Sequence, residues 1–418
     1  MSILVKNRQY YKFCAYGFLK NLRFFDAFLL LFFMESGISF TQIGILYATR
    51  EIIINVSEIP SGILADTYGR KKSLIVAFIL YIISFLVFYF FNTFYFFILA
   101  ITFFGIADAF RTGTHKGMIM DYLAINNWQD QKANYYGHTR SWSQKGSALS
   151  ALIAGFLVLY SGSYHTVFLY SVIPYLINFI NIYSYPNSLN YSLNESKKTQ
   201  QVTLVFVFKS FINALKHPKV LQIINSSSLH SSYLKAIKDY IQPVMLQIAL
   251  IIPFLMQLDP KRKSGIIIGI IYFIIFLLTS YASKKSFKIS EAFGFNISKL
   301  TLEIGLVTGM ICGVFYEFEL WFLTLLFFAF IYIVENIRKP LLIGEIADHV
   351  PPELLTSVLS AQSFFSTITT SILAISIGFI ADHFGFGIAI IIISCILLLF
   401  TEILNIQTLK KFSKNSQS

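Results

Sequence analysis

The stretch that decides the fold is Gly-Ile-Leu-Ala-Asp-Thr-Tyr-Gly-Arg-Lys-Lys-Ser-Leu, residues 62–74. It joins one strongly apolar segment, 41–63, to the next, 73–91. Two long apolar segments on either side of a short turn predict two membrane helices, because a lipid-embedded backbone must satisfy its own hydrogen bonds. Basic loops stay in the cytoplasm, so the three basic residues 70–72 predict that this turn lies at the cytoplasmic surface.

The order G-x-L-A-D-x-x-G-R-K-x-x-L in this turn resembles the signature that the major facilitator superfamily carries between its second and third membrane helices. The matching positions are Gly62, Leu64, Asp66, Gly69, Arg70, Lys71 and Leu74. Seven matches at this place favour the resemblance over an ordinary basic turn. The resemblance implies an all-α membrane protein with twelve transmembrane helices in two six-helix bundles. It also implies a gating motif made of Gly62, Asp66, Gly69, Arg70 and Lys71.

The composition is typical of a polytopic membrane protein. Of the 418 residues, 56% are hydrophobic, 17% aromatic and only 13% charged. Three distant cysteines and seven scattered histidines form no metal-binding or disulfide pattern, and no glycine-rich phosphate-binding loop is present. We therefore expect no metal, no cofactor and no enzymatic activity. The first helix is expected to serve as its own insertion signal, because no cleavable leader is recognisable.

Twelve apolar segments reach the length of about 20 residues that crosses a bilayer. They are 13–36, 41–63, 73–91, 94–115, 138–160, 164–185, 219–247, 264–282, 299–317, 320–346, 354–380 and 386–406. The predicted domains are an N-terminal bundle (1–185), a polar cytoplasmic linker (186–218), a C-terminal bundle (219–406) and a cytoplasmic tail (407–418). Residues 241–258 are ambiguous; an extra span there would move the basic tail outside, so we predict an extended or half-buried outer segment.

The basic residues set the orientation. With both termini in the cytoplasm, only Lys261, Arg262 and Lys263 fall outside. This distribution explains the net charge of +12 without a nucleic-acid partner. The richness in Ile, Phe, Lys and Asn suggests an AT-rich bacterial genome. We therefore expect a multi-pass monomer in the cytoplasmic (inner) membrane of a bacterium, with the lipid bilayer and a small-molecule substrate as its partners.

Charged residues inside the spans carry the functional signal. Each costs roughly 2.5–3.5 kcal/mol at the bilayer centre, so such groups are expected to face a wet or protein-lined space. They recur at helical spacing in five spans. The rows are Lys20, Arg23 and Asp26; Arg50, Glu51, Asn55 and Glu58; Asp108, Arg111 and His115; Lys235, Lys238, Asp239 and Gln242; and Glu335, Arg338, Lys339 and Glu345. The resemblance implies a central cavity lined by most of these helices.

Each row also has a structural interpretation. Asp108 and Arg111 could form an ion pair within one helix, and Lys20 or Lys235 could extend to the membrane surface. Arg50 beside Glu51 could hold the N-terminal bundle together. Arg338 lies well inside a span and is followed by Pro340, which favours a cavity role.

Transport by alternating access is the predicted function, ahead of a membrane enzyme or receptor. The predicted substrate-binding residues are Arg23, Arg50, Arg111, Lys235, Arg338 and Glu335. Their mixed charge with strong basic members favours an anionic or zwitterionic organic solute. Asp26, Glu51 and Glu58 are candidates for proton coupling, since desolvated carboxylates can titrate near neutral pH. The alternative is a multidrug/proton antiporter that exports lipophilic cations, although the Gly-Pro pair common in the fifth helix of such antiporters is missing.

Two further hypotheses concern the turns. Asp66 is expected to be attracted to the positive end of the eleventh helix, near residues 351–353, and to lock an inner gate. The sequence Gly-Phe-Ile-Ala-Asp-His-Phe-Gly (378–385) echoes residues 62–69. It lies at the outer end of the eleventh span instead of after the eighth, where a duplicated half would place it. We therefore predict a tight outer turn with a weak resemblance to the motif.

Overall fold

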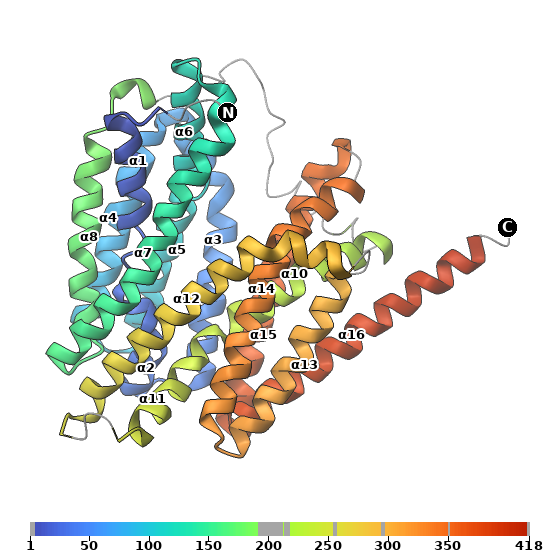
Figure 1. Cartoon of the computed structure of the whole chain (residues 1–418). Coiled ribbons are helices and arrows are strands. Elements are labelled where there is room, and N and C mark those ends of the chain that lie inside the picture. The colour runs from blue at the N-terminus through green and yellow to red at the C-terminus, as the bar shows by residue number, and fades with distance from the viewer. Residues whose placement is uncertain are drawn as a thin grey trace. The chain divides into compact units, whose positions relative to one another are not determined.

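The computed structural model is helical almost throughout the part of the chain that it describes (Figure 1). The described residues are 5–190, 212, 218–253, 257–293, 297–349 and 352–415. The chain divides into two compact units. Unit 1 comprises Met1–Ser36, Thr49–Val202 and Ile252–Phe273, and unit 2 comprises Gly37–Ala48, Thr203–Ile251 and Ile274–Ser418. The helix α3 therefore begins in unit 2 and continues in unit 1.

Unit 1 is built from apolar helices around an aromatic core. Its elements are α1 (Arg8–Leu19), η1 (Phe24–Ala27), α2 (Leu29–Glu35), most of α3 (Phe40–Tyr68), α4 (Arg70–Phe90), α5 (Phe94–Arg111), α6 (Thr114–Ile125), η2 (Gln129–Gln131), α7 (Lys132–Ser161), α8 (Thr166–Tyr183) and η3 (Asn187–Leu189). The helix α4 packs against α5 and α8, and α1 packs against α7. Phe25 stacks on Phe168 with ring centroids 5.2 Å apart.

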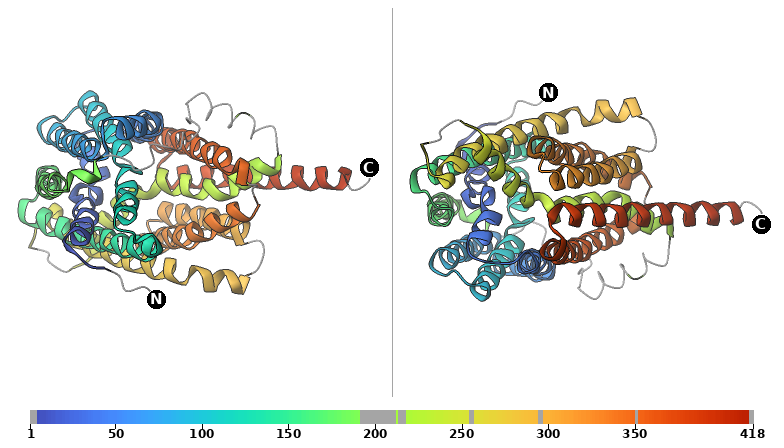
Figure 2. Two further views of the ribbon diagram at one scale, coloured as in Figure 1. Left: turned by 90° about the horizontal axis from the view of Figure 1, so that it is seen from above. Right: turned by 90° about the horizontal axis from the view of Figure 1, so that it is seen from below.

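Unit 2 contains α10 (Pro218–Ile237), η4 (Lys238–Tyr240), α11 (Ile241–Ile251), α13 (Ile297–Glu317), α14 (Trp321–His349), α15 (Pro352–Phe384) and α16 (Phe386–Asn415). The helix α12 (Pro260–Phe293) starts in unit 1 and ends in unit 2. Within unit 2, α13 packs against α14 and α16, and α10 packs against α15. Figure 2 shows these helices from both ends, with α13 to α16 in orange to red.

Eight helices among the described residues are long and apolar enough to cross a membrane. They coincide with eight of the twelve predicted spans. The other four predictions fall on α1 with α2, on α3, on α7, and on α10 with α11. These helices are interrupted or carry several polar residues, as expected for helices that face a polar interior. The predicted all-α membrane fold is confirmed.

Two of the predicted spans are broken, which corrects their expected side-chain rows. The first span unwinds between α1 and α2, where Arg23 adopts φ −95° and ψ 82°, so Lys20, Arg23 and Asp26 do not share one helical face. The fourth span breaks at Gly113, whose φ of +80° is readily adopted only by glycine. His115 therefore lies on α6, whereas Asp108 and Arg111 lie on α5.

For the segment 241–258, expected to be extended or half-buried, the structure decides against the extended form. Residues Ile241–Ile251 form the helix α11, which follows α10 after the short turn η4, so this part is helical and not extended. Pro243 is compatible with this helix because it falls in the first turn, where its missing N–H has no partner to lose.

Candidate functional site

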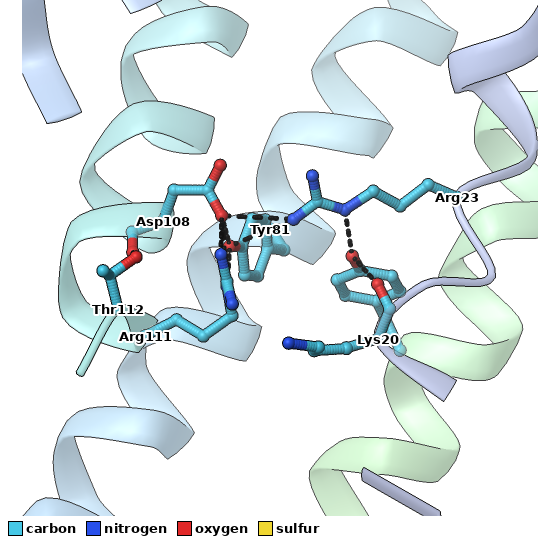
Figure 3. Close-up of polar contacts among 7 residues, drawn as sticks. Lys20, Arg23, Tyr81, Asp108, Arg111 and Thr112 are labelled. Atoms are coloured by element: carbon cyan, nitrogen blue, oxygen red, sulfur yellow. Dashed lines mark hydrogen bonds and ion pairs between the residues drawn. The ribbon is translucent and has the colours of Figure 1, made fainter. Parts of the chain in front are cut away.

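A cluster of charged side chains lies inside unit 1 around the carboxylate of Asp108 (Figure 3). The Oδ1 atom of Asp108 lies 3.1 Å from Nη2 of Arg23 and 2.8 Å from Nη2 of Arg111. The hydroxyl of Tyr81 donates a hydrogen bond to the same oxygen. Arg23 in turn donates from Nε to the hydroxyl of Tyr175 at 2.8 Å. The unwound segment at Arg23 and the helices α4 and α5 thus meet at one carboxylate, and Tyr175 of α8 joins them through Arg23.

The unwound chain between α1 and α2 makes this cluster possible. Because residues 20–23 are not helical, Arg23 reaches Asp108, while the backbone carbonyl of Lys20 accepts a hydrogen bond from Tyr175 at 2.8 Å. The Lys20 ammonium group points toward the guanidinium group of Arg111 (Figure 3). One carboxylate therefore faces two guanidinium groups and an ammonium group, so the pairing of Asp108 with Arg111 leaves an excess of positive charge.

A cavity of about 610 Å³ lies beside this cluster in unit 1. Its lining comes from α1, α6, α7 and the end of α5 and includes Lys20, Arg111, Lys116 and Arg140. Within the described part of unit 1, none of the residues that line the cavity is Asp or Glu. Hydroxyl and amide side chains complete the polar lining. The cavity is a pocket of concentrated positive charge with neutral hydrogen-bonding groups around it.

Aromatic rings hold part of the cavity wall in place. The ring of Tyr16 stacks on that of His115 with centroids 3.5 Å apart. The Nζ atom of Lys116 lies 5.3 Å from the centroid of Tyr136, a distance at which a ring face attracts a cation. Close packing of α1 on α7 depends on Gly146, since a Cβ there would meet the backbone carbonyl of Phe18.

Sequence reasoning found only part of this cavity. Arg111 was predicted as a binding residue, and Lys20 was noted as charged within a span. Lys116 and Arg140 were assigned only to the cytoplasmic side of the membrane. No local pattern marks these two as cavity residues, because their convergence depends on how α6 and α7 pack.

The motif turn is held within unit 1. Gly69 has φ +107°, and its neighbour Arg70 donates from its backbone N to the carbonyl oxygen of Asn190 at 2.7 Å. The guanidinium of Arg70 contacts Oδ2 of Asp121 on α6 at 2.5 Å. Asp66 lies 3.4 Å from Arg70, and its side chain is 65% exposed. The Arg70 side chain thus ties the turn to α6 and leaves the Asp66 carboxylate largely open.

The other motif residues have simpler surroundings. Lys71 donates from Nζ to the carbonyl oxygen of Tyr185 at 2.7 Å, which fixes the start of α4 to the chain just after α8. Gly62 lies within α3, and a Cβ there would meet no atom within 4 Å of it. Among the described residues, no close backbone approach therefore depends on Gly62.

A second buried polar cluster lies in unit 2. The Nδ1 atom of His230 lies 2.8 Å from Oε2 of Glu335, and Ser231 donates a hydrogen bond to the other oxygen of Glu335. One turn along α14, Arg338 is 1% exposed and donates to Oγ1 of Thr301 at 2.6 Å and to the backbone carbonyl of Ser226. Of this cluster, the sequence predicted Glu335 and Arg338 and missed His230, whose spacing gave no signal.

The remaining predicted residues are not among the contacts described above, although the carboxylate of Asp26 interacts electrostatically with Arg23. Arg50 and Glu51 form a pair at 3.4 Å on α3. Asp26, Glu58 and Lys235 have exposed side chains within their own units. The side chains of Lys339 and Glu345, and of residues 351–353, lie outside the described residues.

The comparisons with known proteins assign the family. A family model described as Major Facilitator Superfamily matches residues 14–333, and the chain belongs to this family. It is 22% identical over 382 residues to YxaM of Bacillus subtilis (strain 168), described as an uncharacterized MFS-type transporter; the match covers 90% of this chain and 89% of that protein.

Solved structures of transporters share the fold. The nucleoside transporter NupG is similar with a TM-score of 0.74 and 14% identity, over 95% of this chain and 98% of that one. A bacterial homologue of the human lysosomal transporter Spinster has a TM-score of 0.67 and 13% identity, over 98% and 99%. A D-xylose–proton symporter has a TM-score of 0.59 and 14% identity, over 95% and 96%. The family and these neighbours indicate a transporter and not an enzyme.

Proposed function

We propose that this chain is a secondary transporter that moves a small anionic or zwitterionic organic solute across the membrane by alternating access. The observation that carries the proposal is the cavity of unit 1, with four cationic side chains and no carboxylate among its described lining residues. Two of the four, Lys20 and Arg111, are only partly exposed, and holding like charges together there is costly unless something offsets their charge. A bound anion supplies that compensation.

The same cavity argues against the runner-up function. A lipophilic cation entering it would approach Lys20, Arg111, Lys116 and Arg140. Near Lys20 and Arg111, which are partly buried, repulsion between like charges costs more than in water. A multidrug antiporter for cations would therefore need another binding surface.

A binding experiment tests the proposal. The purified full-length protein in detergent is screened by thermal unfolding against organic anions, zwitterions, neutral sugars and lipophilic cations. A ligand at about 100 times its dissociation constant stabilises the folded state by about 2.7 kcal/mol, which is a measurable shift. We expect stabilisation by anions or zwitterions, lost in Arg140→Gln.

Lys145→Gln is the matched control for that experiment. Lys145 lies on the same helix as Arg140, lies over Trp142 and does not line the cavity. We expect this variant to keep the ligand-induced shift. Stabilisation by lipophilic cations alone, or equal loss in both variants, would contradict the proposal.

We further propose that transport is coupled to protons. The sequence-based candidates for the proton-binding group are Asp26, Glu51 and Glu58. Burial favours Glu51, and the contact with His230 adds Glu335 to the candidates, because the imidazole and the carboxylate can share one proton. The similarity to a D-xylose–proton symporter is consistent with proton coupling.

Uptake into liposomes tests the coupling. Glu335→Gln is expected to abolish accumulation driven by a pH gradient and to retain exchange of labelled for unlabelled substrate, which needs no net proton movement. Undiminished gradient-driven accumulation in this variant would return the role to Glu51 or Glu58.

We also propose that the protein is a monomer in the inner membrane of a bacterium, with both termini in the cytoplasm.

A further inference from the structure

Two turns of this chain share a sequence and a local structure. Residues 62–69 and 378–385 are identical at four of eight positions, namely Gly62/Gly378, Ala65/Ala381, Asp66/Asp382 and Gly69/Gly385. The last glycine has a positive φ in both turns, +107° at Gly69 and +90° at Gly385. A new helix begins immediately after each one, α4 at Arg70 and α16 at Phe386. The echo in the sequence therefore marks the same helix–glycine–helix turn.

The carboxylate of the second turn is fully engaged. Oδ1 of Asp382 accepts a hydrogen bond from the backbone N of Phe40 at 2.8 Å. Oδ2 accepts one from the backbone N of Thr41 at 2.8 Å and one from its hydroxyl at 2.5 Å. Phe40 is the first residue of α3, so Asp382 satisfies N–H groups that have no partner inside that helix. The negative charge also lies at the positive end of the helix dipole.

Small residues bring the two helices into direct backbone contact at this place. A Cβ on Gly378 would meet the backbone carbonyl of Phe40, and a Cβ on Gly44 would meet the backbone carbonyl of Ala374. Glycine on each helix thus permits an approach that any larger residue would prevent. The hydrogen bonds of Asp382 close the end of this contact between α3 and α15.

The first turn of the pair differs in its carboxylate. Asp66 lies at the other end of α3, whose 29 residues extend about 43 Å. Its side chain is 65% exposed, and its contact is with Arg70 of its own turn. The start of α3 is therefore hydrogen-bonded by the Asp382 carboxylate of α15, while the Asp66 carboxylate at its other end is largely exposed to solvent.

We infer that Asp382 is a gating residue of the transport cycle, which latches the start of α3 to α15 on the side of the membrane opposite the 62–74 turn. The start of α3 belongs to unit 2, and from Thr49 the same helix belongs to unit 1. Release of Asp382 would free α3 from α15 at this end. The latch is closed in this structure. The inference rests on the proposed alternating-access transport but not on the identity of the substrate.

A distance measurement tests the latch. Spin labels are attached to Ile38→Cys, just before α3, and Phe384→Cys, in the exposed turn after Asp382, with the three native cysteines replaced by alanine. Pulsed electron paramagnetic resonance on the full chain in lipid nanodiscs gives the distance distribution. Asp382→Ala is expected to raise the ratio of long to short distances about five-fold, the ratio that corresponds to the loss of about 1 kcal/mol of capping energy.

His383→Ala is the matched control. The His383 ring hydrogen-bonds the carbonyl of Phe379 on its own helix, so its removal should leave the distances unchanged. An unchanged distribution in both Asp382→Asn and Asp382→Ala would overturn the inference. The measurement needs no substrate. Failure of the anion screen with a positive distance result would therefore reject the proposed substrate class and keep the latch.

Discussion

Asp108→Asn is the substitution that tests the charge cluster of unit 1 most directly. The variant keeps the size of the side chain and removes the negative charge that pairs with both Arg23 and Arg111. Loss of one partner of a fully buried pair costs about 3–5 kcal/mol, because the remaining charge is left without compensation. The two arginine side chains are 18% and 21% exposed, which lowers this figure through partial hydration. We expect a loss of about 2–3 kcal/mol in the free energy of unfolding.

The assay compares Asp108→Asn with Asp66→Asn by denaturant-induced unfolding in the same detergent. Asp66 also neighbours an arginine, but its carboxylate is 65% exposed. Exposed ion pairs contribute about 0–1 kcal/mol, so Asp66→Asn should remain near the wild type in stability. If the two variants lost the same free energy, Asp108 would not be the compensating charge of the cluster, and the excess positive charge inferred for the cavity would have to be revised.

Two further substitutions test packing and buried hydrogen bonds. Gly146→Ala should destabilise the protein by about 1–3 kcal/mol in a thermal unfolding assay, since the new Cβ would press against the carbonyl of Phe18. Gly137→Ala is the control on the same helix. A Cβ at Gly137 meets open space, so this variant should be neutral or slightly stabilising. Arg338→Ala should cost about 2–4 kcal/mol, because the arginine is buried and bonded to Thr301 and Ser226, and a loss below 0.5 kcal/mol would argue that these bonds are not made.

The sequence predicted the family and the fold, and both predictions are confirmed. The prediction succeeded because both signals are local. Hydropathy over about 20 residues reports the environment of a span whatever it packs against. The turn at 62–74 carries its own geometry, since the positive φ at Gly69 requires a glycine wherever the helices lie.

Local signals failed where packing decides the backbone. The predicted helix over 13–36 unwinds around Arg23. Arg23 instead contacts Asp108 and Tyr175, which lie on neighbouring helices, so the sequence of the span alone does not show the break. The break at Gly113 separates His115 from Asp108 and Arg111 although their spacing is helical. The segment 241–258 was expected to be extended or half-buried, but its residues 241–251 are helical, and Pro243 fits into the first turn of this helix.

The sequence by itself determined that the chain is a twelve-helix transporter of this family with costly charges inside its spans. Only the tertiary structure decided which charges act together. Lys116 and Arg140 join Lys20 and Arg111 in one cavity because α6 and α7 pack beside α1. Asp382 meets the start of α3 across more than 300 residues of chain. Electrostatic and hydrogen-bond energies depend on distance in space, which a linear pattern of residues does not contain.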